Sequence, residues 1–583
     1  MRTTTRLAAV RAAAAAGALA VGLAGLGATA SAVDTLANID DAKAAQATLT
    51  IHKHVKPAPG TTPGHPTGDK PQTASDPVEG VVFTAYKINN LDLSNQDNWE
   101  NLAKHASTPL NSSVCDGTVV GAGLPGGLTV DTAKPIVFDK TSTAGEATKQ
   151  LGLGAFLICE TDTSGAKVKN ADVRVIDKAL PFIVALPYPN SKAAQGTASD
   201  WIYDVHSFPK NTVVNKPSKN VKVTEASHGL GTADQVTYTI DAVVPDVDDA
   251  SENFKYFTIY DQLPKGASHV KISSVQIGTG VGGDGTLTAA QDVPADKYVK
   301  TVDEDTRFAR VDFNQATQLT YLESVPGQTI RVTITAQQDN LSEAGTAENT
   351  GYLLVDTETK PYDPGNPPTV DEPPTGDGVP PLTPPQGDTP PKTTGDVPPL
   401  PTNKVVTTWG EVKVTKKDKA SENLLKGATF QVFNAVEPYA QDCSNAVKSG
   451  DAISVLTKDS FTSDEHGVVT IPGLFVDEEK GTGDDAPTPD HNQRCYVLVE
   501  TAAPAGYVLP DDTAAHTPIT VVAGAAGDAG GNNHIVITNT KTAVPALPLT
   551  GASGQVLMMA GGAALVLLSA GTVLVARRRE AQD

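Results

Sequence analysis

Three residues that lie far apart in the last third of the sequence have the chemistry to react with one another. Lys416 follows Val-Lys-Val-Thr, Glu500 follows Cys-Tyr-Val-Leu-Val, and Asn539 follows Ile-Val-Ile-Thr. This alternation of apolar residues predicts β-strands, with Lys416 on the strand face of Val414 and Glu500 on that of Leu498. The three side chains are therefore expected to converge inside an apolar sandwich.

A lysine, a glutamate and an asparagine that meet in such an interior can form an amide. Burial disfavours charge, so it lowers the pKa of the lysine and raises that of the glutamic acid until both are neutral. The neutral amine is then a nucleophile, and the acid polarises the asparagine carbonyl and carries protons. Attack by the amine expels ammonia. The alternative is an ordinary strand lysine at the surface.

The elements that must position these residues are strands throughout the chain. Segments such as Thr-Leu-Thr-Ile at 48–51, Val-Thr-Tyr-Thr-Ile at 236–240 and Ile-Arg-Val-Thr-Ile at 330–334 alternate and are rich in β-branched residues. We predict an all-β chain of three tandem immunoglobulin-like β-sandwich domains, at 33–205, 206–356 and 405–541. Recurrent Pro-Pro pairs predict a semi-rigid polyproline II linker at 357–404.

Both ends of the sequence have the composition of targeting segments. Arginines at 2, 6 and 11 precede an alanine-rich apolar run and small residues, which predicts a signal peptide over 1–32. Residues 556–576 carry no charge and are followed by three arginines, which predicts a transmembrane segment. The product is then secreted, and its net charge of −22 excludes binding to a nucleic-acid backbone.

The four cysteines form two separated pairs without the close spacing of a zinc site. Because the compartment is oxidising, we expect disulfides, with Cys115 bonded to Cys159 and Cys443 to Cys495, each within one domain. No cofactor or metal site is predicted. Four acidic residues of the second domain are interpreted as a solvated loop rather than a calcium site: Asp246, Asp248, Asp249 and Glu252.

The extreme C-terminus resembles the sorting signal that sortases recognise in Gram-positive bacteria. Leu547-Pro548-Leu549-Thr550-Gly551 is followed by the apolar stretch and then by the arginines. The resemblance implies that a sortase cysteine attacks the carbonyl of Thr550, expels Gly551 and holds Thr550 as a thioester until an amine takes it.

Two further motifs resemble the domains of sortase-assembled pilins. The run Glu500-Thr-Ala-Ala-Pro-Ala-Gly-Tyr is similar to the pilin E-box of Cna B-type domains, which implies that Lys416 bonds Asn539 with Glu500 as catalyst. The second domain resembles the Cna A type, in which an aspartate takes the role of the glutamate.

In the second domain the matching residues are Lys219, Asp261 and Asn349, and Lys216 is an alternative to Lys219. In the first domain the sequence around Glu160 resembles only a degenerate E-box, because the Ala-Pro-x-Gly-Tyr continuation is missing. We therefore expect no internal bond in the first domain.

The segment from Trp201 to Asn211 resembles the pilin motif, with Val205 four residues after the tryptophan and Pro-Lys-Asn at its end. Phe208 replaces the usual tyrosine. The resemblance implies that Lys210 is the amine that accepts Thr550. Because proline cannot donate to a sheet ladder, we expect the segment to lie exposed at a domain edge.

Taken together, these motifs resemble the major shaft subunits of sortase-assembled pili of Actinomyces and related actinobacteria. The resemblance implies a cell-wall-anchored structural subunit that is a sortase substrate and not an enzyme, except for autocatalysis of its own cross-links. Its partners would be a pilus-specific and a housekeeping sortase, identical subunits, a tip or minor pilin, peptidoglycan, and surface ligands of host or bacteria. The alternatives are a wall-anchored monomeric adhesin or a minor pilin. A secreted hydrolase is disfavoured because no hydrolytic cluster is recognisable.

Overall fold

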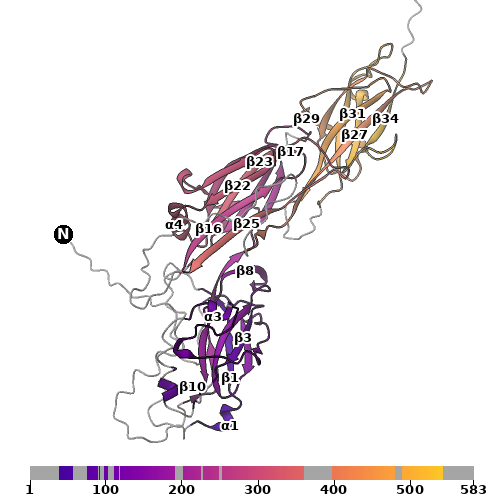
Figure 1. Cartoon of the computed structure of the whole chain (residues 1–583). Helices are drawn as coiled ribbons and strands as arrows, with labels where there is room; N and C mark the ends of the chain where they lie inside the picture. Colours follow the sequence, from indigo (N-terminus) through magenta and orange to yellow (C-terminus); the bar gives the residue numbers. More distant parts are fainter. Residues whose placement is uncertain are drawn as a thin grey trace, which may run out of the picture. The chain divides into compact units, whose positions relative to one another are not determined.

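The structure is a computed structural model (Figure 1). It describes residues 39–56, 75–190, 201–359, 397–479 and 489–541, apart from short gaps at 90, 92, 94–96, 101, 103–109, 117, 225–227 and 248–251. Two compact units are present. The first runs to Trp409 and includes 455–457 and 473–492, and the second contains the rest of the chain.

The first part of the chain is built from short strands in three main sheets. Their orders are β12-β1-β5, β2-β13-β8-β7 and β4-β3-β6-β9. The strands are β1 (Thr48–His52), β2 (His54–Val55), β3 (Val82–Lys87), β4 (Ile136–Val137), β5 (Glu146–Gln150), β6 (Gly154–Asp162), β7 (Lys167–Val168), β8 (Ala171–Asp177), β9 (Phe182–Leu186), β10 (Tyr188–Pro189), β11 (Trp201–Ile202), β12 (Asp204–Ser207) and β13 (Lys210–Asn215). Strand β13 lies beyond the boundary expected at residue 205, because it pairs with β2 and β8.

The next part holds two five-stranded sheets, β14-β15-β23-β17-β20 and β21-β22-β16-β25-β26, and a short β18-β19 pair. Its strands are β14 (Ser218–Val223), β15 (Val236–Val243), β16 (Glu252–Gln262), β17 (Ala267–Gly278), β18 (Gly280–Val281), β19 (Leu287–Thr288), β20 (Gln291–Asp292), β21 (Val299–Asp303), β22 (Phe308–Phe313), β23 (Thr329–Gln338), β24 (Thr346–Asn349), β25 (Gly351–Thr359) and β26 (Leu400–Pro401). Alternating burial along β23 confirms the pattern read from its sequence.

The last part begins with β27 (Val405–Asp418), whose first residues pair with β24. It continues with β28 (Thr429–Ala435), β29 (Lys448–Ala452), β30 (Phe461–Thr462), β31 (Val468–Glu479), β32 (Gln493–Ala502), β33 (His516–Val522) and β34 (His534–Asn539). Strands β28, β32 and β33 are neighbours in one sheet, and β34 runs parallel to β27. The first and last strands of this sandwich are therefore hydrogen-bonded to each other.

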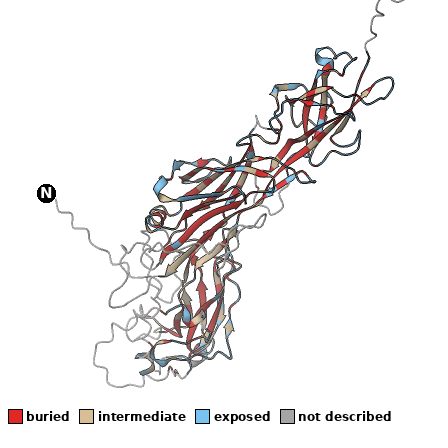
Figure 2. Ribbon diagram, turned by 45° about the horizontal axis from the view of Figure 1, so that its top comes forward, coloured by how far each residue is buried: buried red, intermediate tan, exposed pale blue. Residues whose placement is uncertain are grey.

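Helices are few and short in the described residues. They include α1 (Asp41–Ala44), α3 (Ser113–Asp116), α4 (Ala316–Glu323) and a helical stretch at 97–100, with 3-10 turns η2 (Pro125–Gly127), η3 (Ala295–Lys297), η4 (Cys443–Asn445) and η5 (Asp512–Ala515). Buried residues are concentrated on the strands (Figure 2). The expected all-β fold with immunoglobulin-like sandwiches is thus confirmed.

Several expectations fall outside the described residues. They are the signal peptide at 1–32, most of the linker at 357–404, and the C-terminal segment at 542–583 with its apolar stretch at 556–576. Among the helices that the structure does describe, none has the length and apolar character needed to cross a membrane.

Candidate functional site

The last sandwich brings together the lysine, glutamate and asparagine that the sequence predicts to converge. Lys416 lies on β27, Glu500 on β32 and Asn539 at the end of β34, and the three are at most 3% exposed. The Lys416 Nζ donates to Glu500 Oε2 at 2.8 Å and lies 2.6 Å from Asn539 Oδ1. The Asn539 amide nitrogen donates to Glu500 Oε1 at 2.8 Å. One carboxyl group therefore contacts both the amine and the amide.

The parallel pairing of β27 with β34 accounts for this convergence. The register joins Lys416 to Ile537 and Asp418 to Asn539, so the asparagine lies two pairs beyond the lysine on the neighbouring strand and on the same face of the sheet. Burial lowers the pKa of Lys416, and the hydrogen bond and negative charge of Glu500 oppose this shift only in part. The lowered pKa favours the neutral, nucleophilic amine beside the amide carbonyl.

A second cluster lies among the strands β14 to β25, as expected. The amine of Lys219 on β14 donates to the Asp261 carboxylate on β16, and the Asn349 amide on β24 donates to the same oxygen at 3.3 Å. Burial lowers the pKa of Lys219. The lysine that enters the cluster is Lys219, which is 1% exposed, whereas Lys216 is half-buried outside it.

Two oxygens of this second cluster have no hydrogen-bond partner among the described residues. They are Asp261 Oδ1 and Asn349 Oδ1, and both are buried. A buried polar atom without a partner costs on the order of 1–3 kcal/mol. The cluster is therefore a high-energy arrangement that a chemical rearrangement of the amide could relieve.

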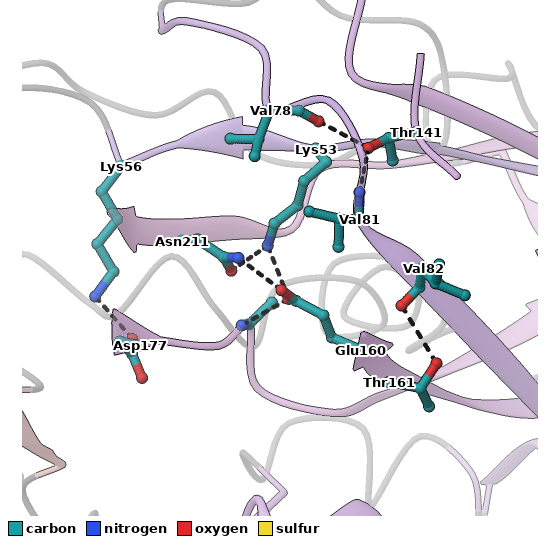
Figure 3. A network of polar contacts seen from close by, with 11 residues as sticks. Lys53, Lys56, Val78, Val81, Val82, Thr141, Glu160, Thr161, Asp177 and Asn211 are labelled. Atoms are coloured by element: carbon teal, nitrogen blue, oxygen red, sulfur yellow. Dashed lines mark hydrogen bonds and ion pairs between the residues drawn. The ribbon is translucent and has the colours of Figure 1, made fainter. Parts of the chain in front are cut away.

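A third cluster, which the sequence analysis did not anticipate, lies in the first part of the chain (Figure 3). Lys53 Nζ donates to Glu160 Oε2 at 2.9 Å and also contacts the amide oxygen of Asn211. Asn211 Nδ2 donates to Glu160 Oε1 at 2.6 Å. Lys53 and Asn211 are fully buried, and burial lowers the pKa of Lys53. Our expectation rested on an incomplete motif, yet the structure assembles the full set of groups.

The placement of its lysine and asparagine along the chain could have revealed this third cluster. In each of the other two sandwiches the lysine lies on an early strand and the asparagine on a late one. Lys53 likewise comes early, directly between β1 and β2, and Asn211 comes late, on β13. The expected domain boundary at residue 205 separated Asn211 from its own sandwich. In all three clusters an aromatic ring lies 4.9–5.6 Å from the lysine nitrogen: Phe83 for Lys53, Tyr238 for Lys219 and Phe430 for Lys416.

Lys210, the fourth lysine of interest, is the first residue of β13 and is half-buried. Burial is what lowers its pKa, with no contribution from a neighbouring carboxylate. It differs in this from the lysines of the three clusters, each of which contacts an acid. Two residues before it, Phe208 stacks on His52 with ring centroids 4.6 Å apart, which fixes the preceding segment. Its amine is half-buried and forms no ion pair with the part of the chain that the structure describes.

The predicted cysteine pairing is confirmed. The structure contains the Cys115–Cys159 and Cys443–Cys495 disulfides, which close loops of 44 and 52 residues. Each loop closure contributes roughly 3–4 kcal/mol in the chain-entropy description.

Thiol labelling checks the cysteine pairing directly. Denaturation without reductant should expose no reactive thiol, because all four cysteines are paired. After reduction the same assay should count four thiols per chain. Two or more thiols before reduction would contradict the pairing.

An all-β chain with buried lysine–acid–asparagine clusters in its sandwiches defines the class of sortase-assembled pilin subunits. Residues 44–212 match the N-terminal D1 domain of Gram-positive pilin subunits, 410–480 a prealbumin-like fold domain, and 539–581 the LPXTG cell-wall anchor motif. The Thr550 signal itself lies outside the described residues.

Comparison with individual relatives identifies the protein family more narrowly. It is 34% identical to the type 2 fimbrial subunit of Actinomyces naeslundii, covering 98% of this chain and 96% of the relative, and it belongs to this family of fimbrial subunits. It is 29% identical to the type 1 fimbrial subunit of Actinomyces viscosus, covering 92% of this chain and 91% of the relative. The full-length major pilin SpaD of Corynebacterium diphtheriae shares its fold, with a TM-score of 0.57 and 23% identity over 87% of this chain and all of SpaD.

The protein is therefore a structural subunit of a cell-wall-anchored surface fimbria and a substrate of sortase, as the sequence analysis expected. Subunits of this family polymerise into pili.

Proposed function

We propose that this subunit is linked head to tail, with Thr550 of one copy joined through an amide to Lys210 of the next. The observation that carries the proposal is the state of Lys210, a half-buried amine whose pKa is lowered by burial and which has no carboxylate partner among the described residues. Such an amine is neutral more often than an exposed lysine, and it is free to attack an external thioester. A pilus-specific sortase would form the linkage.

Three internal amides complete the proposal, joining Lys53 to Asn211, Lys219 to Asn349 and Lys416 to Asn539. In each, the lysine nitrogen attacks the asparagine carbonyl carbon, the bond to the amide nitrogen breaks, and ammonia leaves. The acid takes a proton from the amine and delivers one to the departing nitrogen. Contacts of 2.6–2.8 Å among Lys416, Glu500 and Asn539 support this route.

Other partners follow from the polymer. A housekeeping sortase would attach the finished shaft to peptidoglycan, and a tip or minor pilin would occupy its far end. Ligands on host or bacterial surfaces would be met by the assembled fimbria. The rival function is a wall-anchored monomeric adhesin, in which Lys210 is not used.

Cell-wall extracts separate the polymer from the monomer. An immunoblot of wild-type extracts should show a ladder of high-mass species that survives boiling in detergent, since the subunits are joined by amides. Lys210→Ala should leave secreted, wall-anchored monomer and no ladder, because the accepting amine is gone.

Lys216→Ala is the matched control, because this half-buried lysine lies six residues from Lys210 and outside the proposed chemistry. It should leave the ladder unchanged. A ladder that persists in Lys210→Ala would refute the assignment of Lys210, and a single band in wild type would favour the adhesin.

A further inference from the structure

We propose that His54 is the proton acceptor for Lys210 when its amine attacks the acyl group of another subunit. The inference rests on the proposed function and deepens it. In this proposal the pilin itself supplies two reacting residues. Lys210 is the nucleophile and His54 is the base.

The strand register places the two residues side by side. Strands β2 and β13 are parallel, and their paired residues are His54 with Lys210 and Val55 with Asn211. Paired residues of neighbouring strands project from the same face of a sheet, and successive residues alternate between faces. His54 and Lys210 therefore share one face, and Lys53 and Asn211 meet on the other.

Backbone contacts hold this arrangement in place. The His54 amide donates to the carbonyl of Pro209 at 3.3 Å, directly before the lysine. The side chain of His54 is also fixed, because it is only 5% exposed and its Nδ1 lies 2.8 Å from the carbonyl oxygen of Ser75. The imidazole is thus buried beside a half-buried amine.

The contact with Ser75 decides the tautomer of the ring. A carbonyl oxygen can only accept, so Nδ1 must carry the hydrogen and donate it. The lone pair of the neutral ring is then on Nε2, the ring atom farthest from Ser75. Nε2 is the one atom of His54 that can take up a proton.

The surrounding charges keep this ring in its basic form. Burial is the main cause that lowers the pKa of His54, and the positive charges of Lys210 and Lys53 add to it, while the backbone carbonyls nearby oppose it in part. The other charged groups near β2 are already paired. Asp76 contacts Lys169 at 2.8 Å.

Lys56, which directly follows β2, contacts Asp177 at 3.1 Å. His54 is therefore neutral near pH 7 and available as a base.

The proton balance of the reaction needs such a base. Lys210 begins as an ammonium, and the amide that it forms retains one hydrogen on nitrogen. One proton must leave before the attack, because only the free amine is nucleophilic. His54 takes it and returns it to water. The second proton leaves as the tetrahedral intermediate collapses, and it ends on the departing thiolate sulfur.

Purified sortase, the mature protein and a donor peptide containing Leu-Pro-Leu-Thr-Gly provide the assay. The rate of acylation of Lys210 is measured from pH 5.5 to 9.5 by mass spectrometry. The key variant is His54→Asn, because the asparagine amide can still donate to the Ser75 carbonyl but has no basic nitrogen. Sortase has the same pH dependence in every sample, so the ratio of wild-type to variant rates isolates the contribution of His54.

We expect His54→Asn to lower the rate by about tenfold or more at pH 7, within the range of general-base effects. The ratio should fall toward one near pH 9.5, where Lys210 loses its proton without help. A ratio that is the same at every pH indicates a structural role alone and overturns the inference, as does a ratio of one throughout.

Further variants distinguish a structural role of His54 from a catalytic one, and both from an error in the proposed linkage site. His54→Gln loses the Nδ1 donor as well as the base, so a purely structural role would make it much worse than His54→Asn at every pH. His269→Gln alters an exposed histidine elsewhere and should match wild type. Acylation that continues in Lys210→Ala would refute the proposed linkage site itself, not the role of His54.

A measurement on unreacted protein does not depend on any change at His54. The pKa of His54, followed by NMR, should rise in Lys210→Ala, since the variant removes a neighbouring positive charge and some of the burial. An unchanged pKa would show that the two side chains do not face each other and would overturn the inference.

Discussion

The mature protein is expected to weigh about 51 Da less than its sequence requires, because each of three internal amides releases one ammonia of about 17 Da. The motivating geometry is the acid that, in each cluster, contacts both the lysine nitrogen and the asparagine amide. Intact-mass spectrometry of the reduced, denatured recombinant protein gives the total directly, since reduction removes the small mass change of the disulfides.

Single substitutions assign each ammonia to its sandwich. Glu160→Ala, Asp261→Ala and Glu500→Ala should each raise the mass by about 17 Da beyond the change of residue, because the proton carrier is lost. Glu422→Ala is the matched control, since Glu422 pairs with Lys417 at the surface, next to Lys416 in sequence. It should keep all three bonds. An unmodified wild-type mass would refute every bond at once.

Glu500→Gln is expected to cause the largest loss of stability, confined to the last sandwich. Glutamine keeps the size of the side chain but cannot exchange protons, so Lys416 and Asn539 stay unlinked. The bond closes a loop of 123 residues, and by analogy with disulfides its loss costs about 4–5 kcal/mol. Lys416 would also remain buried without an anionic partner.

Scanning calorimetry can measure this loss, because Lys416, Glu500 and Asn539 all lie in the second compact unit, whereas the other two clusters lie in the first. The unfolding temperature of the last sandwich should fall by roughly 10–20 °C, judged from the usual relation between free energy and melting temperature for domains of this size. Glu422→Gln should change the free energy of unfolding by no more than about 1 kcal/mol, as is usual for exposed ion pairs. Equal shifts in the two variants would contradict the proposed bond.

The last sandwich was the most predictable part, and the reason is local. Lys416 shares its strand face with Val414, so alternation alone places the amine in the core, and the run after Glu500 identifies the acid. In the middle sandwich alternation also separates the rival lysines. Lys219 has the parity of Val221, which is buried on β14, whereas Lys216 does not.

The first sandwich was harder to predict because β6 is buried on both faces. Seven consecutive residues of this strand, ending at Glu160, are buried, so no alternation distinguishes an inward carboxyl group from an outward one. Its partners depend on pairing between strands far apart in sequence. Lys53 meets Asn211 because β2 and β13 are parallel neighbours, and single-strand patterns contain no information about register.

The two disulfides have a consequence for how a shaft under tension would transmit force. Cys115 and Cys159 lie between Lys53 and Asn211, and Cys443 and Cys495 lie between Lys416 and Asn539. With the proposed amides in place, tension entering at Lys210 would run along the backbone to Lys219, cross to Asn349, continue to Lys416, and cross again to Asn539.

Both disulfides then lie in segments of the chain that carry no tension. Chemical reduction of a stretched shaft should therefore leave its length unchanged, and the cysteines would serve folding and resistance to proteolysis rather than tensile strength. Almost the whole first sandwich is relieved of force in the same way, since the pull enters the chain one residue before Asn211.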